Sequence, residues 1–595
     1  MLEPYRKLFL ILGASSRRRF YILALLSLGS AFLQVVGVGS VFPLMTLVAD
    51  PSAFSTSPHL VKLSQITGIQ SKDAFFAFSG FFMILAILAG NAANVFVTWY
   101  TQRFLADEGV RLSDLLLQKY SYKSYLFFLS NDSTAMCRDV LAEVGVFLGA
   151  YVTPLLDLVV RPTSILVLGA GLIYVNPTAA IGSSIIFGGG YLVVYWLCST
   201  KLEELGQIRI DSEVRKYKIT FELFQGQREA RLLNCREHFF KLYSQNSRKQ
   251  NDAVLYTSLI SQLPRQVIEV LGFALVFALI LLFRAQGKIW DDILPLLSIF
   301  AVGAIRMMPQ FQSLFASIAT LRSAKPVVDR LLPEFTSLID HRCKSAEPLQ
   351  WSDSIEIRDL EYRYPGTDVK VLSGMSFKIP KGAHVGFVGS TGAGKTTLIN
   401  IILGLFSPDS GHFLIDGKEV TDERLLAWQA SFGFVPQDIF LCNDTVAANI
   451  AFGVSSEDID MARVREAAKL ASLAEHIESL PEGYDTKVGE RGVRFSGGQR
   501  QRLGIARALY REPTTLVLDE ATSALDGHTE DTVMDSIRDV GGDKTLLIIA
   551  HRLTTLKECD TIFVLEQGKV VDTGTYEELL SQNETFRAFA KLAPN

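Results

Sequence analysis

The first half of the chain alternates long apolar stretches with charged segments. Six stretches approach the roughly 20 residues that a helix needs to cross a bilayer. They are Tyr21–Val48, Ala74–Tyr100, Leu155–Val175, Ala179–Cys198, Gln266–Phe283 and Ile293–Phe315. The third is interrupted by Asp157, Arg161 and Pro162. The pattern predicts an all-α transmembrane domain of six long helices over residues 1–330.

Positive charge gathers in two long segments between these stretches, Thr101 to about Tyr151 and Lys201–Pro264. Lysine and arginine mark cytoplasmic loops, so we expect both segments and the N-terminus on the cytoplasmic side. An even number of spans places the second half there as well. Two aromatic patches, Tyr122–Phe128 and Phe221–Gln227, are interpreted as coupling helices that dock on the second half. Packing inside the loops is the alternative.

Ionisable residues within apolar stretches are costly in a bilayer and usually face an interior cavity. Arg265 and Arg306 could bind the anionic head group of a lipid there. The alternative is pairing one helical turn away, Arg265 with Glu269 and Arg161 with Asp157.

From Ile355 onward the pattern changes to short strands, glycine turns and helices, which indicates an α/β domain over residues 352–595. The mixed polar stretch 331–351 is expected to be a linker. A mean hydropathy of +0.25 supports a membrane protein, and a net charge of −4 gives no sign of a nucleic-acid partner. Six scattered cysteines indicate reduced thiols rather than a disulfide framework or zinc site.

A phosphate-binding motif lies between an apolar run, His384–Val388, and a helix opening at Thr397. Its spacing fits G-x-x-x-x-G-K followed by Ser or Thr, where glycine amides surround phosphate oxygens. Lysine then meets the β- and γ-phosphates, and the final hydroxyl meets Mg²⁺. The cofactors expected are therefore ATP and Mg²⁺. The motif residues are Gly389, Ser390, Thr391, Gly392, Ala393, Gly394, Lys395 and Thr396, with Thr397 beside them.

Two further positions suit nucleotide binding. Tyr364, about 25 residues before the phosphate loop, can stack on adenine; the alternative is a core tyrosine at a strand end. Ser496, Gly497, Gly498 and Gln499 open a helix whose free amides form a second anion site. We expect this helix to reach the γ-phosphate held by a different subunit.

Candidate catalytic residues follow apolar strands. Asp519 is placed to hold Mg²⁺ and Glu520 to polarise the attacking water. Gln437 can contact both from a loop. His551, after the strand Thr545–Ala550, can reach the γ-phosphate, and Asp526 is expected to cross to the partner.

With these motifs, residues from about Ile355 to Asn595 resemble the nucleotide-binding domain of ABC transporters, an α/β P-loop domain. Gly489-Glu490-Arg491-Gly492 is similar to the loop that exporters use to contact coupling helices, while Phe495 stands where leucine is usual. The resemblance implies a half-transporter exporter: a homodimer in the lipid bilayer with two composite sites that both hydrolyse ATP.

Leu263-Pro264-Arg265 and Ala304-Ile305-Arg306 with Pro309 resemble bacterial lipid-linked oligosaccharide flippases. In those proteins cavity arginines are thought to meet the carrier's pyrophosphate. This sequence departs from them in Ala74–Tyr100, which holds no basic residue. The resemblance implies an inner-membrane flippase for a polyprenyl-pyrophosphate-linked oligosaccharide or another lipid. Exporters of hydrophobic drugs, lipids or peptides are the alternative, and a non-pumping ABC regulator is a remote one.

Overall fold

The structure is a computed structural model that describes residues 2–49, 53–175, 177–285, 290–337, 347–521, 527–540, 544–550 and 553–592. The chain forms two compact units. The first unit joins Met1–Lys123 to Ser130–Ile339, and the second joins Ser124–Leu129 to Asp340–Asn595.

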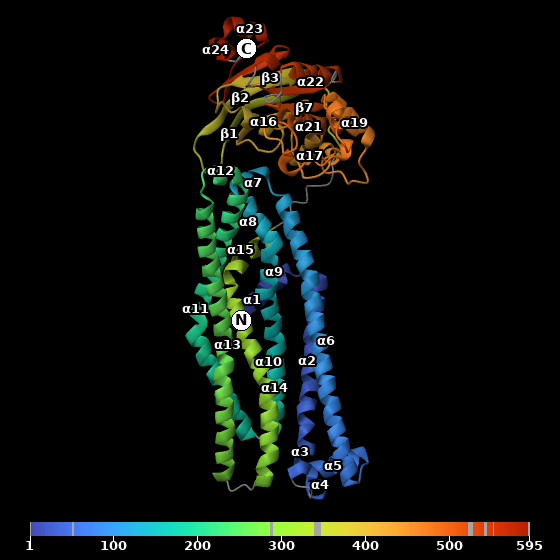
Figure 1. Cartoon of the computed structure of the whole chain (residues 1–595), viewed down its shortest axis with the longest axis vertical. Helices are drawn as coiled ribbons and strands as arrows, with labels where there is room; N and C mark the ends of the chain where they lie inside the picture. The colour runs from blue at the N-terminus through green and yellow to red at the C-terminus, as the bar shows by residue number, and fades with distance from the viewer. Residues whose placement is uncertain are drawn as a thin grey trace. The chain divides into compact units, whose positions relative to one another are not determined.

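Long helices that run side by side build the first unit (Figure 1). Every apolar stretch expected from the sequence falls within them. They are α2 (Ala14–Gly39) continued by α3 (Val41–Ala49), α6 (Lys72–Ser121), α10 (Thr153–Val175), α11 (Pro177–Gln225), α13 (Arg236–Ala285) and α14 (Trp290–Ser323). Three stretches of the described chain are long and apolar enough to cross a membrane, by length and composition: Ala14–Val48, Lys72–Ser121 and Ser133–Ala170.

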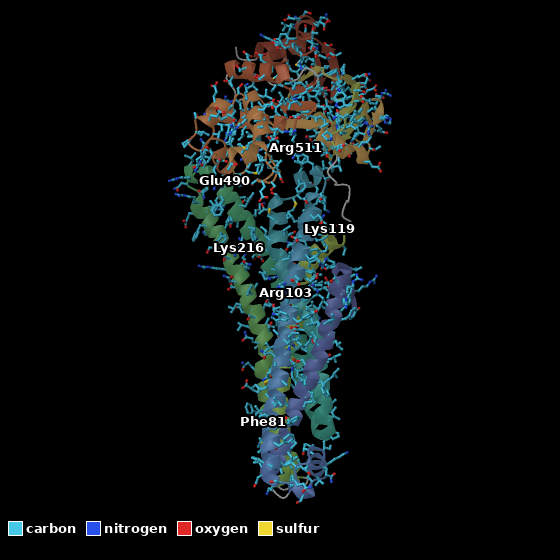
Figure 2. All side chains as sticks on the ribbon, turned by 90° about the vertical axis from the view of Figure 1, so that its right-hand side faces the viewer. Phe81, Arg103, Lys119, Lys216, Glu490 and Arg511 are labelled. Atoms are coloured by element: carbon cyan, nitrogen blue, oxygen red, sulfur yellow. The ribbon has the colours of Figure 1, made fainter. Side chains whose placement is uncertain are left out.

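The helix α6 shows how far these helices extend. It has 50 residues, or about 75 Å at the usual helical rise, and so exceeds the roughly 30 Å hydrocarbon core of a bilayer. Figure 2 labels Phe81, Arg103 and Lys119 in succession along it, from its apolar part to its charged part.

Shorter helices precede, connect or follow the long ones. They are α1 (Leu2–Ile11), α4 (Ala53–Thr56), α5 (Pro58–Thr67), α8 (Ser133–Arg138), α9 (Val144–Phe147), α12 (Gln227–Leu232) and α15 (Lys325–Thr336), with π-helical turns η1 (Asp139–Glu143) and η2 (Leu148–Val152) around α9. The second expected coupling segment, Phe221–Gln227, is divided between two helices: residues 221–225 complete α11, and Gln227 begins the separate short helix α12.

The charged residues of α10 are paired. Arg161 Nε lies 3.1 Å from Asp157 Oδ1, so the alternative of pairing one helical turn away is confirmed for these two residues. From α14, Gln310 accepts a hydrogen bond from Arg161 at 3.2 Å, and Ser317 donates to Asp157 at 3.2 Å. These contacts compensate for the cost of placing charge in an apolar helix.

The helix α15 changes the expected linker boundary. Residues 331–336, which we expected to open the linker, complete α15 instead. Leu331 and Phe335 are buried one turn apart, and Lys119 Nζ donates to the carbonyls of Glu334 at 3.0 Å and Phe335 at 2.7 Å. A buried apolar stripe and a capped end therefore extend the helix beyond residue 330.

Two sheets form the frame of the second unit. The antiparallel sheet has the order β2 (Lys370–Pro380), β1 (Ser354–Arg363), β4 (Ser410–Ile415) and β5 (Lys418–Glu419). The larger sheet has the order β10 (Lys569–Gly574), β9 (Thr561–Glu566), β3 (His384–Gly389), β8 (Thr545–Ile549), β7 (Thr515–Asp519) and β6 (Phe432–Val435). Its strands are parallel except β10.

The helices of this unit are α7 (Tyr125–Ser130), α16 (Lys395–Ile402), α17 (Asp422–Ala430), α18 (Val446–Ile450), α19 (Met461–Leu470), α20 (Ala474–Glu478), α21 (Gly497–Tyr510), α22 (Gly527–Val540), α23 (Tyr576–Gln582) and α24 (Glu584–Leu592). The parallel strands read as continuous apolar runs because both faces are covered: β7 and β8 are buried at every position. The expected fold class, a helical membrane domain plus an α/β nucleotide-binding domain, is confirmed.

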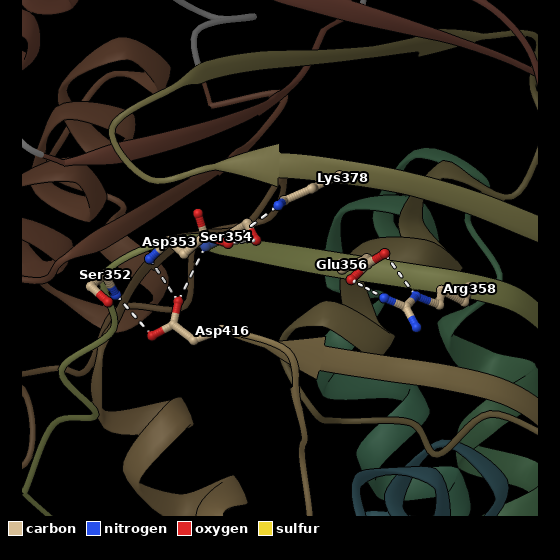
Figure 3. A network of polar contacts seen from close by, with 7 residues as sticks. All are labelled: Ser352, Asp353, Ser354, Glu356, Arg358, Lys378 and Asp416. Atoms are coloured by element: carbon tan, nitrogen blue, oxygen red, sulfur yellow. Dashed lines mark hydrogen bonds and ion pairs between the residues drawn. The ribbon is translucent and has the colours of Figure 1, made fainter.

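A network of hydrogen bonds and ion pairs surrounds the start of β1 (Figure 3). Asp416 has a left-handed φ of 50° in the turn between β4 and β5. Its carboxylate accepts hydrogen bonds from the backbone N–H groups of Ser352, Asp353 and Ser354 at 2.9, 2.7 and 3.1 Å. The turn thus fixes the segment that leads into β1.

Candidate nucleotide-binding site

The phosphate loop joins the end of β3 to the start of α16. A Cβ on Gly389 would lie 2.3 Å from the carbonyl oxygen of Leu565, and Gly394 has a φ of +100°. Neither position accepts a side chain without distortion. Ser390, Thr391, Gly392 and Ala393 form the turn between them, and Thr396 follows on α16 with an exposed side chain. The loop therefore presents its backbone and the N-terminus of α16 to a ligand.

The Lys395 side chain is enclosed by this loop. Its Nζ donates to the carbonyls of Gly389 at 2.7 Å and Ser390 at 3.2 Å. Burial lowers the pKa of Lys395 from its ordinary value, while the charges of Glu520 and Asp519 act in the opposite direction. The ammonium thus lies within electrostatic reach of both acids.

The two acids lie at the carboxyl end of β7, the strand next to β8. Asp519 ends β7 and is 8% exposed. Glu520 has a left-handed φ of 52°, and its backbone N–H donates to the carbonyl of Ile549 at 3.1 Å. Because the carboxyl ends of parallel strands meet at one edge of a sheet, β3, β8, β7 and β6 bring their following residues together there.

Gln437 reaches this edge from the loop after β6. Its amide Nε2 donates to Glu520 Oε2 at 2.7 Å. A charge-assisted hydrogen bond of this kind orients the carboxylate. The structure thus brings together four residues that were singled out separately in the sequence: Lys395, Asp519, Glu520 and Gln437. His551 and Asp526 lie outside the described residues.

A capping box begins α21. Ser496 Oγ accepts the backbone N–H of Gln499 at 3.2 Å, and Gln499 Oε1 accepts the backbone N–H of Ser496 at 2.8 Å. Gly497 and Gly498 occupy the first turn. The helix start is therefore rigid, and its glycines leave the backbone open to close approach.

Tyr364 lies directly after β1, half-buried among aromatic rings. Its hydroxyl is 3.1 Å from Thr397 Oγ1, and its ring meets Tyr362 edge-on at 5.4 Å and Phe406 at 5.8 Å. The sequence reasoning missed Phe406, which belongs to no motif. It also gave no role to Arg507 of α21, which donates to the carbonyl of Phe440 in the loop after Gln437 at 2.6 Å.

The residues present fit a Mg²⁺ that is bound together with nucleotide. Thr396, Asp519 and Gln437 offer the hard oxygen donors that Mg²⁺ prefers, and this ion takes its other ligands from phosphates and water. Within the described ranges, no group of three or more His, Cys, Asp or Glu could hold a metal by itself. The candidate substrate residues Arg265 and Arg306 lie in α13 and α14, but their side chains are not among those that the structure describes.

Comparison with known proteins agrees with these features. Residues 372–523 match the family model "ABC transporter". The ATP-dependent lipid A-core flippase of Alkalilimnicola ehrlichii is 30% identical over 511 residues, 85% of each chain. The flippase of the same name from Cupriavidus pinatubonensis is 44% identical over 232 residues, and that from Pseudomonas aeruginosa is 34% identical over 374 residues. These two matches span 39% and 60% of the relatives' lengths.

The fold has a close counterpart among solved structures. A bacterial Atm1-family ABC exporter with ATP bound superposes with a TM-score of 0.77, covering 98% of this chain and all of the other at 23% identity. The fold, the gathered motifs and the long match to a relative lead to one conclusion: this chain is a member of the ABC transporter family.

Proposed function

We propose that the protein is an ATP-driven flippase that moves an amphipathic lipid across the inner membrane as a homodimer. The observation that carries this proposal is the match over 85% of the chain to a relative named as a lipid A-core flippase. It is supported by a nucleotide site in which Gln437 and Glu520 are already hydrogen-bonded. The nucleotide site and the match to a flippase belong to the same polypeptide. We therefore propose that one protein both hydrolyses ATP and transports the lipid.

In this proposal the phosphate loop and Lys395 hold the phosphates of ATP, and Tyr364 supports the adenine. Glu520 accepts the proton of the attacking water, and Gln437 keeps its carboxylate oriented. Thr396, Asp519 and Gln437 would hold Mg²⁺, which neutralises charge on the phosphates when bound.

The second copy completes each site. Ser496, Gly497, Gly498 and Gln499 of one chain would meet the γ-phosphate on the other, because a capped helix start with bare glycine amides suits an anion. When the two nucleotide domains close, Asp526 would contact the partner chain and His551 would contact the γ-phosphate. Closure of the two nucleotide domains around ATP would then turn the cavity outward, and hydrolysis would reset it.

We also propose that α7 transmits this closure. The segment Ser124–Leu129 belongs to the second unit, where Leu126 packs against the apolar core around β1 and α16. The helix α12 and the loop Gly489–Gly492 are proposed to take part in coupling as well. Gly489 and Gly492 have left-handed φ values of 80° and 71°, so the loop between them is sharply bent.

The proposed substrate is a lipid with a phosphorylated, sugar-bearing head group. A polyprenyl-pyrophosphate-linked oligosaccharide and a lipid A-core glycolipid share this chemistry. The guanidinium groups of Arg265 and Arg306 would bind the phosphates, since a planar fork of donors suits a phosphate group.

ATPase stimulation in proteoliposomes tests the proposal. The panel contains a lipid A-core glycolipid, a polyprenyl-pyrophosphate oligosaccharide, zwitterionic phosphatidylcholine and a hydrophobic drug. We expect the phosphorylated glycolipids alone to stimulate hydrolysis and to reach the opposite leaflet in the presence of ATP. Arg265→Ala and Arg306→Ala should remove stimulation but keep basal hydrolysis, while Arg265→Lys keeps the charge as a control. Equal stimulation of the alanine variants would exclude the head-group role.

A further inference from the structure

Four aromatic rings from three separate segments stack within the second unit. Tyr125 of α7 lies 6.1 Å from Phe406, with their planes 29° apart. Phe406 stacks on Tyr362 at 5.3 Å with planes 2° apart, and meets Tyr364 edge-on at 5.8 Å. Centroid distances and angles of this kind are those of favourable aromatic pairs. A continuous row of rings thus runs from α7 to the end of β1.

The far end of this row reaches the phosphate loop. The Tyr364 hydroxyl is hydrogen-bonded to Thr397 Oγ1 at 3.1 Å. Thr397 lies two residues after Lys395 on α16 and is 4% exposed. The residue that supports adenine and the helix that holds the phosphates are therefore joined side chain to side chain.

The backbone of Phe406 is tied to the same helix. Phe406 N–H donates to the carbonyl of Asn400 on α16 at 3.2 Å, and Leu405 N–H donates to the same carbonyl at 2.8 Å. Phe406 is 5% exposed and Tyr362 is 4% exposed, so neither ring can turn without moving its neighbours. A shift of α16 on nucleotide binding would move the ring on which Tyr125 rests.

We propose that Phe406 is a positioning residue that links the nucleotide site to α7 through this row of rings. The proposal deepens the proposed function, because it rests on α7 being a coupling helix. Phe406 does not contact the reacting atoms. It sets the position of Tyr364 against adenine according to where Tyr125 lies, so that a displacement of α7 changes ATP affinity and the reverse.

The competing explanation is that Phe406 only packs in the core. The two explanations differ in how changes at Tyr125 and Phe406 together affect ATP binding. If Phe406 only fills space, a change at the exposed Tyr125 leaves KM for ATP unchanged. If it links the two ends, the effect of Tyr125 on ATP must pass through Phe406 and disappear when the ring is lost.

The test is a double-mutant cycle on the full chain in proteoliposomes, with KM for ATP and kcat measured without added substrate lipid. Loss of one aromatic pair should raise KM between about two-fold and ten-fold. We expect Tyr125→Ala and Phe406→Leu each to raise KM while kcat changes less, and the double variant to resemble Phe406→Leu alone. Phe406→Tyr should restore the dependence on Tyr125, which a merely space-filling role does not require.

Phe128→Ala is the matched control. Phe128 is another exposed aromatic of α7, and its ring packs edge-on against Phe127 of the same helix, so KM for ATP should stay at the wild-type value. If Phe406→Leu fails to fold, Tyr125→Ala combined with Thr397→Val tests the other end of the row, with the same non-additive result expected. An unchanged KM for ATP in Tyr125→Ala, or KM changes that multiply in both cycles, would overturn the proposal. Lipid stimulation of the wild type is measured separately, so absence of any flippase activity leaves this result interpretable.

Discussion

The hydrogen bond between Gln437 and Glu520 allows the proposed hydrolysis to be tested quantitatively. Gln437→Ala removes the amide that donates to the carboxylate at 2.7 Å. A hydrogen bond to a charged group contributes about 1.5–3 kcal/mol, and we take the lower value because the pair is solvent-exposed. Since about 1.4 kcal/mol corresponds to a factor of ten, kcat should fall roughly ten-fold. Glu520→Gln removes the base itself and should lower kcat by a factor of about 10² to 10⁴.

The two substitutions should not multiply. If Gln437 acts by orienting Glu520, adding Gln437→Ala to Glu520→Gln should change kcat little. The assay is steady-state phosphate release from the full chain, together with nucleotide binding, which Glu520→Gln should retain. Asp438→Asn, an exposed neighbour on the same loop, serves as the control and should keep wild-type kcat. Independent effects, or phosphate release by Glu520→Gln at the wild-type rate, would refute the assignment.

Three further predictions concern the same unit. The Tyr362 hydroxyl is buried without a hydrogen-bond partner in the described part of the chain, so Tyr362→Phe should stabilise the unit by about 1 kcal/mol and raise the unfolding midpoint by a few degrees; a lower midpoint would reveal a partner. Although burial raises the pKa of Asp416, hydrogen bonds from three backbone N–H groups bring it below the ordinary 3.8. Its contribution to stability is therefore complete above that value and is lost as the pH falls through the lowered pKa. Urea unfolding should accordingly show that the free energy of unfolding falls less at acid pH in Asp416→Ala than in the wild type. Burial lowers the pKa of Lys395, whereas the phosphates of ATP favour its charged form. ATP binding should therefore be accompanied by proton uptake at alkaline pH, just below the ordinary lysine pKa of 10.5. Calorimetry in buffers of different ionisation enthalpy should detect this uptake, and Lys395→Met should lack it.

The sequence predicted the helical half well because membrane spans are set by composition over about 20 residues. All six expected stretches lie in long helices. The end of the last helix was placed too early, because the stretch after residue 330 contains proline and serine but also Leu331 and Phe335 on one buried face. Composition indicated a linker there, whereas tertiary burial of that face prolongs α15.

The nucleotide site was predictable for a different reason. Each motif follows a short apolar strand, and parallel strands bring such positions to one edge whatever their distance along the chain. Gln437 and Glu520 are 83 residues apart yet hydrogen-bonded. Phe406 has no such marker, since its environment consists of rings from β1 and α7. No local pattern reports a contact between segments so far apart, and only the folded arrangement reveals it.

The backbone at Glu520, the proposed catalytic base, has a conformation that lowers the stability of the fold. A left-handed φ of 52° costs a residue with a Cβ about 1–2 kcal/mol, and strain of this kind persists where the surroundings enforce it. The bond from its N–H to Ile549 at 3.1 Å holds the chain in this turn directly after the last residue of β7. In this conformation the Glu520 carboxylate accepts the hydrogen bond from Gln437, and we expect the strained turn to be what positions it. At most sites glycine is less stable than alanine by about 0.4–1 kcal/mol, owing to the freedom of the unfolded chain. At this site the order should reverse: Glu520→Gly should unfold at higher denaturant than Glu520→Ala, and neither should hydrolyse ATP at a normal rate. If Glu520→Ala proves the more stable of the two, the turn is not strained and another contact must orient the carboxylate.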